Sequence, residues 1–284
     1  MKRILAATDF STRSDRALRR ATLLAQAVGA ELVLAHVVDS DGSPETLDDQ
    51  RREAEVILED LAATVRETDR VSCRAIVLSG EAPEQIAALA AETGADAIVV
   101  GPPRRNAVRN LLVGATAARS ARAGGAPVIL AAGVPRGGYR QILIATDLSD
   151  ASATAARAAR DLGMLNGVRT AAVHAYEAPG QGLLLRANLT QAQFRAYLLE
   201  EGAKARGELA EFLNAANLSA NEQIVELIES TPAAAIRSVA SRIRADLLVV
   251  GARGRSAVES LLLGSVTTEL VAASDIDLFI ASGG

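Results

Sequence analysis

The residues best suited to chemistry in this sequence are glycines and a serine near its C-terminal end. Gly251 and Gly254 follow the apolar run Leu247–Val250, and nine residues separate Gly254 from the pair Gly264-Ser265. We expect Gly251 to leave a buried strand with unusual dihedrals, and Gly254 to offer N–H groups that no Cβ screens. Gly264-Ser265 opens the helical pattern Val266–Ala273, and a helix start carries unpaired N–H groups and a partial positive charge. This arrangement fits either an anion site, with phosphate as the expected ligand, or a tight strand-to-helix turn without a ligand, and the rest of the chain has to decide between them.

Other candidate residues have structural as well as functional interpretations. Asp9 and Asp147 follow apolar runs, and each suits a turn that bonds the next helix, a ligand contact, or both. His36 and His174 occupy equivalent places, and we predict structural histidines because no serine or cysteine nucleophile is paired with either. Neither a Gly-Lys-Ser/Thr sequence nor a Gly-x-Gly-x-x-Gly pattern occurs, and zinc-ligand spacings are absent as well.

Composition excludes several classes of protein. The charge is −4, from 30 Lys+Arg against 34 Asp+Glu, and aromatic residues make up only 2%. Basic patches and stacking surfaces for nucleic acid are therefore not expected. The single cysteine, Cys73, rules out an internal disulfide, and no apolar run reaches the length of a membrane span. With an N-terminus that enters a predicted strand at once, these features predict a cytoplasmic protein without membrane contact.

The sequence contains an internal repeat of one unit. The segment Ile4–Ser11 recurs as Ile142–Ser149 at an offset of 138, and His36 recurs as His174 at the same offset. The run that ends in Gly101 recurs as the run that ends in Gly251, now at an offset of 150. Ordered matches of this kind indicate a duplication. We place the domains at residues 1–137 and 138–284, joined by a short glycine-rich linker at 133–138.

Each copy alternates strand and helix patterns, which predicts an α/β fold with a parallel, doubly wound sheet. In the first copy, strands are predicted at 4–8, 31–38, 72–78, 97–100 and 127–131, and helices at 14–28, 43–67, 83–93 and 115–123. In the second, strands are predicted at 141–146, 170–176, 223–228, 247–250 and 277–281, and helices at 151–162, 191–216, 232–243 and 265–273. Because Asp147 and Gly251 end two strands of one copy, we expect both to face one crevice at the carboxyl edge of the sheet.

With Ala-Thr-Asp ending the first strand, a histidine near the end of the second, and the glycine motif, each half resembles a universal stress protein domain. The whole chain looks like a tandem member of that family. The resemblance implies two five-stranded sheets with strand order 3-2-1-4-5, and adenine nucleotide binding in some members. It places Ala145, Thr146 and Asp147 at the adenosine end, and the backbone of Ala175 beside the adenine. It places Gly251, Gly254, Gly264, Ser265 and Val266 around the ribose and phosphates, with Ala252 and Arg253 in the intervening loop.

The first copy departs from this motif. Its corresponding sequence is Gly101-Pro102-Pro103-Arg104, followed by Gly114-Ala115. Two prolines remove two N–H donors, Arg104 replaces a glycine, and Ala115 lacks the hydroxyl group of Ser265. We therefore expect the second domain, and not the first, to bind nucleotide.

Three functions follow from these features. The preferred one is a cytoplasmic stress-response protein with ATP, ADP or AMP, with or without Mg²⁺, as a regulatory ligand of its second domain. The alternatives are slow ATP hydrolysis, for which no clear general base or second magnesium carboxylate is visible, and a nucleotide-independent scaffold for an unidentified protein partner.

The two halves are also expected to pack as an internal pseudo-dimer, and a homodimer of whole chains is left open. In the family, fifth strands often pair antiparallel, which here joins 127–131 to 277–281 and covers two sheet edges. The arginine-rich face formed by Arg13, Arg16, Arg19 and Arg20 is predicted to be solvated.

Overall fold

The structure is a computed structural model that describes residues 1–39, 43–102, 125–178, 190–254 and 263–282. Its first half contains five strands: β1 (Arg3–Ala7), β2 (Glu31–Val38), β3 (Cys73–Ser79), β4 (Ala97–Val100) and β5 (Val128–Leu130). The described helices of this half are α1 (Thr12–Val28), α2 (Pro44–Thr64), the π-helical turn η1 (Val65–Asp69) and α3 (Ala82–Thr93). The helix predicted at 115–123 lies outside the described residues.

The second half repeats this plan. Its strands are β6 (Gln141–Thr146), β7 (Arg169–Tyr176), β8 (Glu222–Leu227), β9 (Leu247–Gly251) and β10 (Asp277–Ala281). Its described helices are α5 (Asp150–Asp161), α7 (Gln191–Ala215), α8 (Pro232–Arg242) and α9 (Ser265–Ala273). No described helix has the length and apolar composition needed to cross a membrane.

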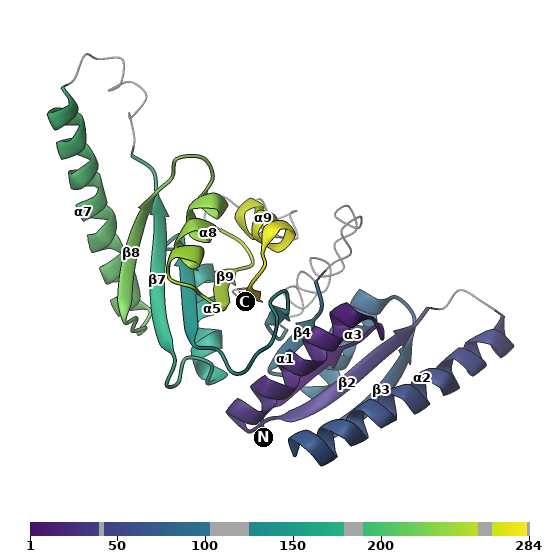
Figure 1. The fold of residues 1–284 in the computed structure, drawn as a ribbon. Helices are drawn as coiled ribbons and strands as arrows, with labels where there is room; N and C mark the ends of the chain where they lie inside the picture. Colours follow the sequence, from purple (N-terminus) through teal and green to yellow (C-terminus); the bar gives the residue numbers. More distant parts are fainter. Residues whose placement is uncertain (40–42, 103–124, 179–189, 255–262, 283–284) are drawn as a thin grey trace.

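All ten strands form one sheet in the order β3-β2-β1-β4-β5-β10-β9-β6-β7-β8. Each half has the predicted order 3-2-1-4-5 with parallel neighbours, and the two halves lie side by side in Figure 1. The predicted pairing of the fifth strands is present: β5 and β10 run antiparallel, with Phe279 opposite Ile129. This pairing covers the edges that separate sheets would expose to solvent.

Helices cover both faces of the sheet, so the strands are apolar throughout. Successive side chains point to opposite faces. Ile4 belongs to the core cluster that contains Ala21 of α1, and its neighbour Leu5 belongs to the cluster that contains Ile86 of α3. The sheet thereby becomes a rigid platform whose carboxyl edges hold the connecting loops.

The expectation that Arg20 is solvated is wrong. Its side chain is only 5% exposed, because it reaches from α1 into the junction between the halves. Its Nε lies 2.5 Å from Oδ2 of the fully buried Asp277. Its Nη1 donates to Gly137 O at 2.8 Å, while the Tyr139 hydroxyl donates to Asp277 Oδ2 at 2.9 Å. A buried ion pair therefore ties α1, the linker and β10 together.

Candidate functional site

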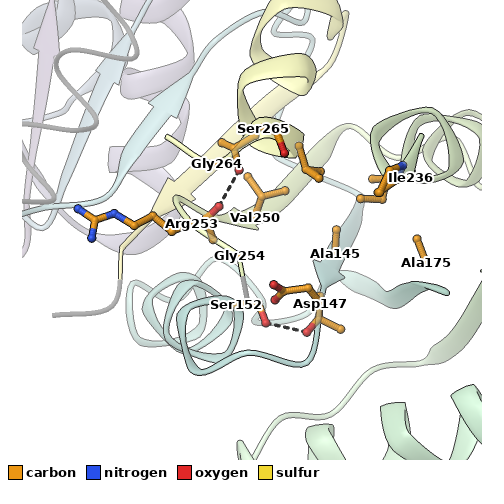
Figure 2. Close-up of a pocket in the computed structure, with 15 residues that line it drawn as sticks. Ala145, Asp147, Ser152, Ala175, Ile236, Val250, Arg253, Gly254, Gly264 and Ser265 are labelled. Carbon is orange, nitrogen blue, oxygen red and sulfur yellow. Dashed lines mark hydrogen bonds between the residues drawn. The ribbon is translucent and has the colours of Figure 1, made fainter. Parts of the chain in front are cut away.

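A pocket of about 310 Å³ opens beyond the carboxyl ends of β6 and β9 (Figure 2). These neighbouring strands meet at the switch point of the second half, where open α/β sheets place their ligands. The predicted residues that line the pocket are Ala145, Thr146, Asp147, Ala175, Gly251, Arg253, Gly254, Gly264, Ser265 and Val266. The fold thus gathers residues that are spread over most of the second half of the sequence.

Sequence reasoning missed part of the lining. The additional residues are Ser152, Pro232, Ile236, Val250 and Thr267. Thr267 and Val250 adjoin predicted residues, so their proximity could have been expected. Ile236 belongs to an apolar helix face whose contact with this edge depends on how α8 packs, which local spacing does not encode.

Ala252 is the predicted residue that lies outside the lining. It is only 1% exposed, and its backbone serves the fold instead. Its N–H donates to Ala281 O at 2.7 Å, and its carbonyl accepts from Gly264 N at 2.8 Å. Ala252 therefore joins the end of β10 to the start of α9 and fixes the loop that carries Arg253 and Gly254.

Glycine is needed at 251 and 254 because other parts of the chain come very close to these positions. This finding corrects the reason given above for Gly251. Gly251 is not among the glycines with left-handed φ values. A Cβ there would lie 3.1 Å from Arg253 O and 3.2 Å from Ser152 N, so any side chain would press on backbone. At Gly254, a Cβ would lie 2.9 Å from Asp147 Oδ2. Glycine at both positions lets the loop after β9 close against the loop after β6.

Asp147 both shapes a turn and lines the pocket. Its Oδ1 accepts from Ser149 N at 3.2 Å and from Ser149 Oγ at 2.5 Å, and Ser149 in turn caps α5. Thr146 Oγ1 lies 2.7 Å from Ser152 Oγ and accepts from Leu148 N at 2.9 Å. These bonds hold the Asp147 carboxylate in place, with Oδ2 directed at Gly254.

The start of α9 forms the donor-rich part of the pocket. Gly264 is its N-cap and supplies no side-chain hydrogen bond. The first backbone bond of the helix runs from Thr268 N to Gly264 O, so the N–H groups of the preceding three residues have no partner within the helix. Thr267 Oγ1 donates to Gly251 O at 2.8 Å and ties the helix to β9. With the helix dipole, these N–H groups favour an anion.

The opposite end of the pocket is apolar. Figure 2 shows Ala145, Ala175 and Ile236 together at this end, with Gly264 and Ser265 at the other. Pro232 and Val250 add to the apolar lining. The pocket therefore suits a ligand with an apolar part and an anionic part.

Both histidines make the same structural contact. His174 Nδ1 lies 3.0 Å from Thr146 O, and His36 Nδ1 lies 2.8 Å from Thr8 O. Each imidazole thereby fixes the end of the first strand of its half. Among the described residues, no group of three or more His, Cys, Asp or Glu side chains is placed to hold a metal ion.

The equivalent edge of the first half differs in charge. Arg13 Nη2 lies 3.8 Å from Asp9 Oδ2, whereas the residue equivalent to Arg13 in the second half is Ala151. Burial raises the pKa of Asp9, but hydrogen bonds from Ser11 and Ser14 and the Arg13 charge outweigh burial and leave this pKa below its usual value. The predicted differences at Pro103, Arg104 and Ala115 lie outside the described residues.

Comparisons with known proteins agree with this architecture. The profile of the Universal stress protein family matches residues 1–131 and, separately, residues 138–282. A Thermus aquaticus protein described as "Universal stress protein in QAH/OAS sulfhydrylase 3'region" is 34% identical over 137 residues, which are 47% of this chain and 92% of the relative. The Bacillus subtilis "Stress response protein NhaX" is 36% identical over 74 residues, 25% of this chain and 45% of that protein.

A solved structure shares the whole fold. The crystal structure of a universal stress protein from Archaeoglobus fulgidus has a TM-score of 0.70 and 19% identity, and the match covers 99% of this chain and 98% of that one. With two profile matches that together span nearly the entire sequence, this chain belongs to the Universal stress protein family and carries two copies of its domain in tandem.

Proposed function

We propose that the protein acts in stress response and that its second domain binds ATP or a related adenine nucleotide as a regulatory ligand. The observation that carries this proposal is the two-ended pocket, apolar beside Ala175 and donor-rich at the start of α9. An adenine nucleotide has the same polarity, with a flat base at one end and phosphates at the other.

The residues present fit such a ligand. Ala145, Ala175 and Ile236, which line the pocket, would contact the base, and the Asp147 carboxylate would accept from ribose hydroxyl groups. Glycine at 254 leaves the Asp147 carboxylate in place, because even a Cβ there would lie 2.9 Å from Asp147 Oδ2. The N–H groups at the start of α9 and the Ser265 hydroxyl would hold the phosphates.

A binding role is favoured over hydrolysis because hydrolysis needs a base within hydrogen-bond reach of an attacking water. Asp147 is the carboxylate in the described lining, and its Oδ1 already accepts two bonds from Ser149. The proposal assigns a single nucleotide site to each chain. The Arg13–Asp9 ion pair in the first half supports this asymmetry, since it places a guanidinium beside the carboxylate that would face a ribose.

Mass spectrometry of small molecules released from the purified, denatured protein tests the proposal, followed by a turnover assay with added ATP. Retained or titratable adenine nucleotide without turnover supports it. Steady production of ADP would support the hydrolase alternative instead. Absence of binding at millimolar ATP would leave the scaffold alternative. The variant Gly254→Arg serves as the control that is expected not to bind nucleotide.

A further inference from the structure

Arg253 is the one cationic side chain in the described lining of the pocket. Within the described part of the chain, no hydrogen bond or ion pair holds it, and its Nε is buried without a partner. A buried donor without an acceptor is unfavourable, so a ligand that supplies an oxygen gains free energy at this position. Figure 2 shows the side chain extending away from the other labelled residues of the pocket, so it has to turn to reach a ligand there.

Because of the charges around the pocket, this arginine affects how well the pocket binds nucleotides with different numbers of phosphate groups. Asp147 contributes one negative charge, and the start of α9 contributes roughly half a positive charge. Arg253 is the side chain of the described lining that brings a full positive charge to a polyphosphate when it turns inward. A monophosphate, which adds less charge, depends far less on this side chain.

The backbone beside Arg253 is held in place. Gly264 N donates to Ala252 O, and Ala252 N donates to Ala281 O at the end of β10, so the loop that carries Arg253 is fixed to its neighbours. Arg253 also stands between the two motif glycines, so its Cα lies beside the pocket, 3.5 Å from the position of a Cβ on Gly264.

We propose that Arg253 turns onto the β- or γ-phosphate of a bound nucleotide. This contact makes the second domain select nucleoside di- and triphosphates over monophosphates, and the inference rests on the proposed nucleotide site. A guanidinium suits this task because it stays charged and pairs with two phosphate oxygens at once.

Isothermal titration calorimetry with ATP, ADP and AMP tests this proposal on the full chain. Wild type should bind ATP at least about tenfold more tightly than AMP. Arg253→Met should weaken ATP by about 10- to 100-fold, the range for one lost hydrogen bond to a charged group, and change AMP by less than about twofold. Arg253→Lys should recover part of the ATP affinity. Arg237→Met, which removes the same charge from an exposed position of α8, should leave both affinities unchanged.

The possible contrary results are separable. Equal affinity of wild type for ATP and AMP, or equal weakening of both by Arg253→Met, would overturn the role of Arg253 and leave the nucleotide site intact. A purely structural role for Arg253 predicts the second of these. If wild type binds none of the three nucleotides, both this inference and the proposed function fail.

Discussion

Replacing single glycines by alanine should have three different effects that the geometry distinguishes. At Gly251 the new Cβ would meet backbone atoms of Arg253 and Ser152 at 3.1 and 3.2 Å. At Gly254 it would meet the Asp147 carboxylate at 2.9 Å. At Gly207, an exposed position within α7, it would meet no atom within 4 Å beyond its chain neighbours and the helix's own backbone. The same methyl group is thus added against backbone, against a side chain, and into open space.

The expected change in unfolding free energy depends on whether the atoms that the new Cβ meets can move. Backbone around Gly251 cannot yield, so Gly251→Ala should lose about 1–3 kcal/mol of unfolding free energy, as overpacked sites do. Gly207→Ala should gain about 0.5–1 kcal/mol from helix propensity. Gly254→Ala should lose only about 0.5–1.5 kcal/mol, because Asp147 can leave its rotamer. Moving that carboxylate should, however, weaken nucleotide binding about tenfold.

Urea unfolding with and without ATP measures both effects. At an ATP concentration 100 times the wild-type Kd, the ligand should add about 2.7 kcal/mol to wild type and only about 1.4 kcal/mol to a variant that binds tenfold less tightly. The reasoning fails if Gly254→Ala keeps the full ATP increment, or if Gly251→Ala is as stable as Gly207→Ala.

Further predictions concern the junction, the buried thiol and the phosphate end. Arg20→Met leaves the buried Asp277 without its cationic partner, although Tyr139 and Gly133 still donate to it, and should cost about 3–5 kcal/mol in urea unfolding. Adding Asp277→Leu should restore part of this loss, and equal stability of wild type and Arg20→Met would contradict the prediction. Burial raises the pKa of Cys73 from 9.0 to about 11, so at pH 8 the thiolate should be about 100-fold scarcer, and Cys73 should react correspondingly slowly with a thiol reagent until the protein unfolds. Ser265→Ala should weaken ATP binding by about 1.5–3 kcal/mol in calorimetry without changing unfolding in the absence of ligand.

The repeat made the fold predictable. Matching the two copies fixed the alternation of strands and helices, and short connections with right-handed crossovers leave few arrangements of the sheet. Most predicted pocket residues line the pocket because they sit at the ends of adjacent strands or at the start of the helix that follows. Their positions depend on strand register, which the apolar runs specify.

What the sequence did not reveal depends on contacts between distant segments. Arg20 looked like part of a solvated face, because nothing near it in sequence shows that Asp277 and Tyr139 will enclose it. The role of Gly251 was misjudged in part for the same reason, since its need for glycine comes from the backbone of α5 and of Arg253 and not from its own dihedrals. Ile236 joined the pocket through helix packing, which a single sequence does not specify.

The central claim is one adenine nucleotide per chain, held by the second domain. Calorimetric titration of the purified, nucleotide-free protein with ATP measures the stoichiometry directly, with Gly254→Arg titrated in parallel. The account predicts one ATP per chain for wild type and no binding by Gly254→Arg, because the side chain would displace the Asp147 carboxylate and fill the loop. Two ATP molecules per chain, or undiminished binding by Gly254→Arg, would contradict it.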